Sequence, residues 1–186
     1  MNEYYFPKEN TYTPMYEVPE EYEEGAYSTR FTFPSKPIPV LSKYKLKESY
    51  QISDIILHPE FSISLNIYNS INIKNIYGGN WIPILLKDKG EHEFMMLQLA
   101  NELNVIDHEK SEFKRKKRGS ISGMKKLILD PDKIESIPLY KRLIFKDESW
   151  GFHTFYHKKI VEKIMSMNPT GIEFIPVNNF NDSWVG

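Results

Sequence analysis

Apolar and polar positions repeat at a fixed interval in two parts of the chain. Residues 75–84, NIYGGNWIPI, align without gaps with residues 168–177, NPTGIEFIPV, and share the pattern Asn-x-x-Gly-x-x-aromatic-Ile-Pro-aliphatic. The same offset aligns further positions upstream: Ile67 with Ile160, Tyr68 with Val161, and Ile71 with Ile164. Apolar residues at i, i+1 and i+4 fall on one face of a helix. Each copy therefore predicts a helix, a glycine turn and a strand that ends at proline, because proline has no N–H for ladder pairing.

Short apolar runs at residues 55–57 and 143–145 are predicted to be the strands before the two helices. The units then cover about residues 54–84 and 143–177, in the order strand, helix, Asn/Gly turn, strand. Five further elements are predicted between them: strands at 93–99, 121–129 and 138–145, and turns at 104–112 and 130–132. Residues 97–103 also favour helix, so two alternatives stay open there. This mixture predicts an α+β fold, with a mixed sheet and a few helices built around the two similar units.

Residues 1–40 differ from the body of residues 41–186. They are rich in Tyr, Glu and Pro, and their prolines would break any long helix. So many aromatic rings are unusual in a solvated tail, which predicts an extended arm or edge strands packed on the body. A disordered leader is the alternative.

Composition limits the classes of protein that fit this sequence. Apolar residues make up 40% and aromatic residues 14%, which is enough for a packed core. The net charge of −1 argues against a molecule that binds polyanions over its whole surface, and the absence of cysteine excludes disulfides and thiolate zinc sites. With no apolar run long enough to cross a membrane and no signal-peptide pattern, the sequence predicts a cytoplasmic protein without a membrane partner.

Residues 107–118 look like a site because Asp107, His108, Glu109 and Ser111 precede five basic residues, Lys114 to Arg118. Adjacent side chains diverge, however, and Asp and Ser commonly brace turns by bonding to nearby backbone N–H groups. The sequence thus favours a turn followed by a solvated basic loop. Nucleic-acid binding through Lys114 to Arg118 is the less favoured alternative, since the run lacks interleaved aromatic residues.

No pattern in the sequence indicates catalysis. His153 and His157 have the i, i+4 spacing of a zinc pair, but HTFYH lacks the glutamate of the HExxH motif. A phosphate-binding glycine loop, a GxSxG nucleophile and cysteine are all absent from the sequence. We therefore expect no catalytic residue, no metal and no cofactor. A metal-dependent enzyme that uses the two histidines is kept as a third hypothesis.

Four stretches in order resemble a bacterial immunity-protein family, the eleventh numbered immunity family of polymorphic toxin systems. They are FMMLQLANELNVIDHEKSEF, MKKLILDPDKI, IPLYKRLIF and HKKIVEKIMSMNPTGIEFIPV, within residues 52–178. The matching positions are Asp107, Ser111, Leu127, Leu129, Asp130, Ile134, Thr170, Gly171, Phe174 and Pro176. Tyr140 departs from the family, which often has Phe there, and residues 1–40 match nothing in it.

The resemblance implies a protein that binds and neutralises a cognate toxin as a tight protein–protein complex. It implies no catalytic residue, and a free protein that is a monomer or a small homo-oligomer. Five of the matching residues are expected to be structural or to contact the toxin: Asp107, Ser111, Gly171, Phe174 and Pro176. The resemblance does not decide between these two roles.

The stretch from Tyr16 to Tyr27 combines rings with negative charge, the ingredients of an interface that meets a basic toxin. Seven residues are predicted to bind the toxin: Tyr16, Glu20, Glu21, Tyr22, Glu23, Glu24 and Tyr27. The alternative is that this segment covers a sheet edge and its glutamates are solvated.

Overall fold

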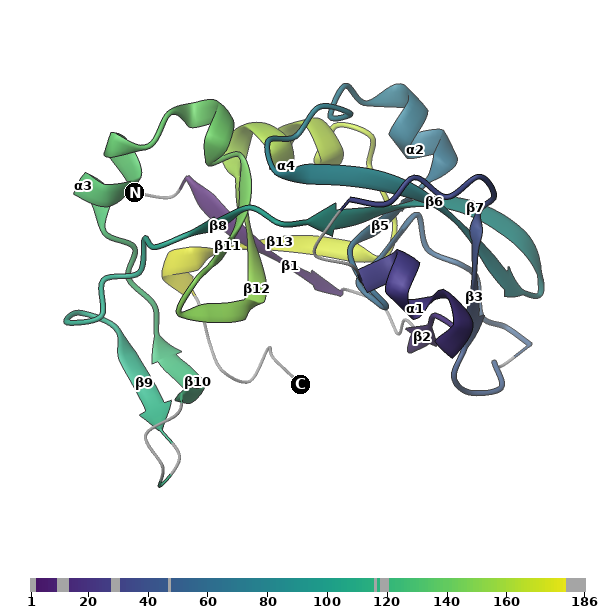
Figure 1. Cartoon of the computed structure of the whole chain (residues 1–186), viewed down its shortest axis with the longest axis horizontal. Coiled ribbons are helices and arrows are strands. Elements are labelled where there is room, and N and C mark those ends of the chain that lie inside the picture. Colours follow the sequence, from purple (N-terminus) through teal and green to yellow (C-terminus); the bar gives the residue numbers. More distant parts are fainter. Residues whose placement is uncertain are drawn as a thin grey trace.

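The chain folds into two mixed β-sheets with short helices on their faces and a separate two-stranded ribbon (Figure 1). A computed structural model describes residues 3–9, 14–27, 31–46, 48–115, 117 and 121–179. The predicted α+β class with mixed sheets is confirmed. Within the described ranges, no helix is both long enough and apolar enough to cross a membrane.

The six-stranded sheet is built on one long hairpin. β6 (Gly79–Asp88) and β7 (Gly90–Leu99) pair antiparallel along their whole length. The strand order is β2-β3-β6-β7-β5-β4, and β3 runs parallel to β6. The other strands are β2 (Tyr16–Glu17), β3 (Ile38–Ser42), β4 (Ile55–Ile56) and β5 (Ser62–Ser64).

The five-stranded sheet joins the two ends of the chain. Its order is β13-β1-β12-β11-β8, with β8 parallel to β11 and the other pairs antiparallel. These strands are β1 (Tyr4–Glu9), β8 (Glu102–Leu103), β11 (Ile144–Asp147), β12 (Trp150–His157) and β13 (Ile172–Pro176). β1 thus lies inside the sheet rather than at its edge.

The 93-residue offset seen in the sequence also relates the structures of the two units. Helix α2 (Leu65–Ser70) follows β5, and helix α4 (Lys158–Met165) follows β12. Their N-caps, Ser64 and His157, occupy equivalent positions, and each side chain accepts a backbone N–H of the first helical turn. After each helix a glycine adopts a positive φ, 62° at Gly78 and 94° at Gly171, and β6 or β13 begins at the next residue.

The structure corrects the predicted strand before each helix. The runs at 55–57 and 143–145 correspond to β4 and β11, which are the antiparallel partners of β5 and β12. Ile55 pairs with Ile63 and Ile144 pairs with Tyr156, so each unit is strand, strand, helix, strand. Pro83 lies within β6 instead of ending it. Proline fits there because the ladder to β3 begins only at Ile84.

Two predictions between the units are wrong in detail, and one open alternative is decided. The strand predicted at 93–99 is part of β7, and residues 97–103 continue β7 and form β8 instead of the alternative helix. Asp130 is the N-cap of α3 (Pro131–Ser136) rather than part of an isolated turn, as an Asp-Pro pair at a helix start allows. The predicted strand at 138–145 begins with a 3-10 helix, η1 (Leu139–Lys141), before β11.

The described residues of the N-terminal segment pack on the body as strands and one helix, and β2 is an edge strand of the six-stranded sheet. β1 is inserted between β12 and β13, and residues Glu20–Tyr27 form helix α1. The glutamates explain this helix, since Glu favours helix and stabilises the first turn through the helix dipole.

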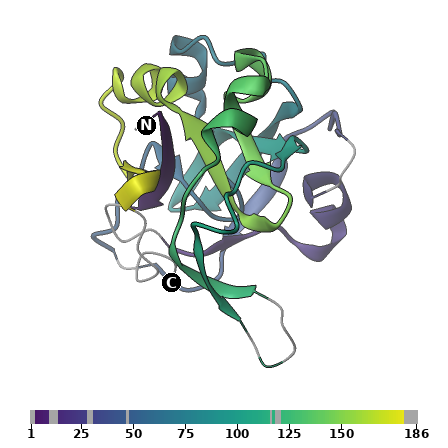
Figure 2. The same cartoon turned by 90° about the vertical axis from the view of Figure 1, so that its left-hand side faces the viewer.

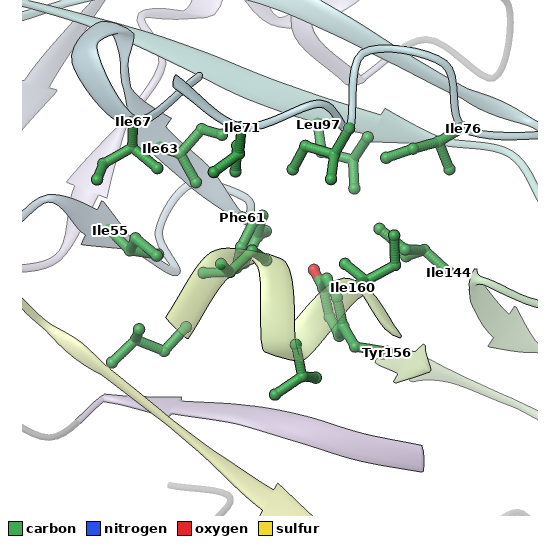
Figure 3. Packing of buried hydrophobic residues seen from close by; sticks show 14 of the residues in the cluster. Ile55, Phe61, Ile63, Ile67, Ile71, Ile76, Leu97, Ile144, Tyr156 and Ile160 are labelled. Atoms are coloured by element: carbon green, nitrogen blue, oxygen red, sulfur yellow. The ribbon is translucent and has the colours of Figure 1, made fainter. Parts of the chain in front are cut away.

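The largest core cluster lies between the two units (Figure 3). Ile63 and Ile67 of the first unit, together with Leu97 of β7, face Tyr156 and Ile160 of the second unit. The apolar face predicted for each helix therefore points into one shared core.

The N-cap of α4 gives a pH-dependent prediction. Burial lowers the pKa of His157, whose Nδ1 accepts the backbone N–H of Lys159 at 3.1 Å and must be unprotonated to do so. The unfolded chain then binds more protons, and stability is expected to fall as the pH drops through about 6.5, the pKa of a free histidine. A His157→Asn variant keeps a capping acceptor, and its urea midpoint should change less between about pH 7 and 5. Equal pH dependence in the two proteins would contradict this assignment.

Candidate functional site

Helix α1 presents four carboxylates to solvent. Glu20, Glu21, Glu23 and Glu24 are all exposed, while Ala26, in the last turn of the same helix, is buried. Pro19 precedes the helix, and its carbonyl accepts the N–H of Tyr22 at 2.8 Å. Three of the glutamates lie in the first turn, where the helix dipole stabilises negative charge.

Exposed apolar side chains gather in the same segment. Seven of the ten large exposed apolar residues in the described ranges belong to residues 15–44: Met15, Tyr22, Tyr27, Phe31, Phe33, Leu41 and Tyr44. Phe33 is 82% exposed. Exposed rings beside acidic groups are typical of a protein-binding surface. We call Glu20, Glu21, Tyr22, Glu23, Glu24 and Tyr27 the α1 surface.

Tyr16 does not belong to this surface. It is 2% exposed, and its hydroxyl donates to the carboxylate of Asp88 at 3.3 Å. Its place in β2, next to β3, turns the ring into the core. The prediction that Tyr16 contacts a partner is therefore corrected, whereas Tyr22 and Tyr27 are exposed.

A buried glutamine fixes the end of α1 to the sheet. Gln98 on β7 is 5% exposed, and its Nε2 donates to the carbonyls of Gly25 and Ala26 at 2.9 and 3.1 Å. The same nitrogen lies 3.0 Å from the Thr32 hydroxyl, and Oε1 accepts the Thr32 N–H at 3.2 Å. Carbonyls at a helix end otherwise lack partners, so Gln98 holds the α1 surface in one position.

A small cavity of about 80 Å³ lies beside the end of α1, with Tyr27, Glu60 and Lys146 among its lining residues. Burial raises the pKa of the Glu60 carboxyl, and Lys146 and His58 partly oppose this shift. Burial and the Glu60 and Glu23 carboxylates also raise the pKa of the Tyr27 phenol. The Tyr27 phenol is consequently neutral near pH 7.

The turn around Asp107 and Ser111 is held by internal hydrogen bonds. Asp107 accepts the N–H groups of Glu109 and Lys110 at 3.1 and 3.0 Å and pairs with the Lys110 ammonium at 2.8 Å. These contacts lower the pKa of Asp107. The buried Ser111 hydroxyl accepts the Ile128 N–H at 2.9 Å and donates to the Ile128 carbonyl at 3.2 Å. Both side chains therefore brace the turn.

The other residues that match the resemblance also have structural contacts. Gly171 lies against Ile55 and Ser53, the ring of Phe174 packs on Tyr156 at 5.5 Å, and Pro176 pairs with Tyr5 in the sheet.

The basic run lies on a ribbon that projects from the body (Figures 1 and 2). β9 (Glu112–Arg115) pairs with β10 (Ile121–Lys126), and Lys114, Lys117, Lys125 and Lys126 are exposed. Residues 116 and 118 of the predicted run lie outside the described residues.

The two candidate metal ligands lie on β12 rather than on a helix. His153 contacts the ring of Phe6, and His157 caps α4. Among the described residues, no group of three or more His, Asp or Glu side chains could hold a metal ion. A depression of about 790 Å³ between residues 50–54, α2 and β7 has a mixed polar lining, in which Lys89 donates to the carbonyls of Glu48 and Tyr50.

Comparison with known proteins adds no relative to this description, because no protein-family model matches the sequence and no curated protein matches it.

Proposed function

We propose that this chain is a cytoplasmic immunity protein, which binds a cognate bacterial toxin through the α1 surface and neutralises it without catalysis. The observation that carries the proposal is the exposed acidic helix flanked by exposed rings, fixed on a rigid sheet. The resemblance of residues 52–178 to an immunity family supports it independently.

The charge of the α1 surface suits a partner with a basic surface. Toxins that act on nucleic acid often carry such a surface. Four carboxylates on one short helix attract positive charge and accelerate diffusional encounter. Fast association matters here, since free toxin harms the cell. Tyr22 and Tyr27 would then supply buried contacts after docking.

Gln98 adds a physical reason for tight binding. A helix whose last residues accept two hydrogen bonds from one buried side chain does not have to be ordered during binding. Less conformational entropy is lost on association, so more of the contact energy appears as affinity.

The direct test is co-expression of the tagged chain with the product of the adjacent upstream gene. We expect a 1:1 complex that survives gel filtration at high salt, and rescue of the cells from that product's toxicity. A chain that elutes alone and rescues nothing would refute the proposed function.

The contribution of α1 can be measured by changing Glu20, Glu21, Glu23 and Glu24 to Gln. Loss of four negative charges should lower the association rate constant at least about tenfold at low salt and flatten its salt dependence. Stopped-flow mixing with the toxin measures both. The matched control neutralises four exposed carboxylates elsewhere: Glu109, Glu135, Glu148 and Glu162. If both variants slow association equally, only net charge matters and the α1 surface has no special role.

The exposed lysines of the β9–β10 ribbon favour a second candidate function, an accessory protein that binds nucleic acid. A salt-sensitive gel shift of RNA or DNA that is lost on changing Lys125 and Lys126 to Gln would support it.

A further inference from the structure

A second surface with exposed rings lies where the two repeat units meet. The remaining large exposed apolar residues of the described ranges are Tyr77, Tyr140 and Met167. Tyr77 and Tyr140 are 47% and 57% exposed, and their rings pack edge to face with centroids 5.7 Å apart. Tyr77 belongs to the turn before β6 in the first unit, and Tyr140 belongs to η1, which immediately precedes the second unit.

One buried residue holds both rings in place. Asn101 is 5% exposed, and its Nδ2 donates to the carbonyls of Lys141 and Ile144 at 2.7 and 2.8 Å. The Asn101 Cβ also packs closely against Gly78: a Cβ added to Gly78 would lie 2.6 Å from it. Ile76, next to Tyr77 in the chain, and Ile144 are part of the core shared by the units (Figure 3). The pair of tyrosines is therefore a rigid feature.

The surroundings of these rings are positive and rich in amides. The Lys141 ammonium lies 5.2 and 5.9 Å from the centroids of Tyr77 and Tyr140. Residues 61–86 contain a single charged residue, Lys74, and residues 136–146 contain no carboxylate. Exposed asparagines recur every three residues nearby: Asn66, Asn69, Asn72 and Asn75. We call Asn72, Lys74, Asn75, Tyr77, Tyr140 and Lys141 the tyrosine–amide face.

This composition fits a protein partner better than a nucleic acid. Tyrosine and asparagine are the residues that antibody binding loops use to contact proteins. Tyr77 packs against Tyr140, and Lys141 lies over both rings, so neither is a free stacking platform for bases. Lys74 lies over Tyr68, and Lys163 donates to the carbonyl of Asn72, so these lysines are held close to the surface. The partner that matches is an acidic protein surface with its own exposed rings.

The molecule itself carries such a surface. We propose that the chain self-associates head to tail, with the α1 surface of one copy docked on the tyrosine–amide face of another. All but one of the large exposed apolar residues in the described ranges belong to the N-terminal segment around α1 or to the tyrosine–amide face, and the α1 helix and this face have opposite charge. Since each copy keeps one unused surface, the contact either continues to a further copy or closes into a ring.

This pairing has a consequence that rests on the proposed function. A toxin bound to the α1 surface would occupy the site that the second copy needs. Toxin and self-association would then compete, and the assembly would be a stored form that dissociates as toxin is bound.

The test is sedimentation velocity of the full chain over a range of concentrations, at about 0.05 M and about 0.5 M NaCl. We expect the mean mass to rise with concentration at low salt and to fall toward the monomer at high salt. A wild-type chain that remains monomeric up to about 0.5 mM would overturn the proposal.

Two variants locate the contact. One carries Gln at positions 20, 21, 23 and 24, and the other carries Tyr140→Ser with Lys141→Gln. Each alone should associate at least about tenfold more weakly, but their 1:1 mixture should form a discrete dimer, because one intact copy of each surface remains. A Lys125→Gln, Lys126→Gln variant, which lacks two exposed lysines outside both surfaces, should behave as wild type, and circular dichroism checks that all variants fold.

Each alternative outcome has a definite meaning. Association that is unaffected by the Tyr140/Lys141 variant, or no dimer in the mixture, would overturn the proposed contact. The face would instead be assigned to nucleic acid if the wild type stays monomeric and binds a fluorescent single-stranded oligonucleotide, and the Tyr140/Lys141 variant does not bind it. If the chain assembles in a salt-sensitive way but the co-expression test finds no toxin, the proposed self-association stands and only the proposed function is refuted.

Discussion

Replacing Asp147 with alanine is expected to cost about 3–5 kcal/mol of folding stability. The carboxylate is fully buried, and Oδ2 accepts the N–H groups of Val105 and Ile106 at 2.9 and 3.1 Å. Oδ1 accepts the N–H and the hydroxyl of Ser149 in the turn between β11 and β12. Alanine would leave these donors without partners in the interior, which costs their desolvation as well as the lost bonds.

Urea unfolding followed by circular dichroism measures this loss. Asp147→Asn is expected to be nearly as damaging, because an amide brings two donors to a place that already has four. The control is Glu148→Ala, one residue away and exposed, which should change stability by no more than about 0.5 kcal/mol. A loss below about 1 kcal/mol for Asp147→Ala would show that water replaces the carboxylate at little cost.

Replacing Gly171 with alanine is the second change with a large expected effect, about 2–4 kcal/mol. Gly171 has a φ of 94°, which side chains with a Cβ rarely adopt. The added Cβ would also lie 2.4 Å from the Ile55 carbonyl oxygen and 2.4 Å from the Ser53 Cβ. The oxygen belongs to the backbone, so relief of the clash requires β4 to move away from the turn.

The matched control is the same substitution at Gly25, with the opposite expected sign. Gly25 is inside α1, and the nearest atom to an added Cβ, the Ile38 Cδ1, would be 3.8 Å away. Alanine favours helix over glycine by up to about 1 kcal/mol, so Gly25→Ala should stabilise the protein. Thermal unfolding of both variants reports the two signs in one experiment. Equal effects at the two positions would contradict the φ and contact argument.

The sequence was informative where a structure depends on neighbours along the chain. Gly78 and Gly171 could be recognised as turn residues because the same spacing recurs around both. Asp107 and Ser111 could be assigned to a turn, since one side chain bonds two and three residues ahead. The helical tendency of Glu20 to Glu24 was also visible in the sequence, but the surrounding prolines outweighed it in the prediction.

Contacts between distant segments were not visible in the sequence. Tyr16 is buried by contacts with distant segments of the chain, and its hydrogen-bond partner Asp88 lies 72 residues downstream. No local pattern in the sequence distinguishes its ring from that of Tyr22. Gln98 holds α1 from a strand 72 residues downstream. The tyrosine–amide face has the same origin, because Tyr77 and Tyr140 meet only after the two units have packed together.

The interior position of β1 has a consequence for how the protein is made. Tyr4 and Phe6 leave the ribosome well before β12 and β13, the strands that pair with β1, which begin at residues 150 and 172. At ordinary rates of synthesis the first strand waits roughly 10–30 s for its partners. During that time its apolar side chains are exposed, so nascent chains of this protein should depend on chaperones until β12 and β13 have been synthesised.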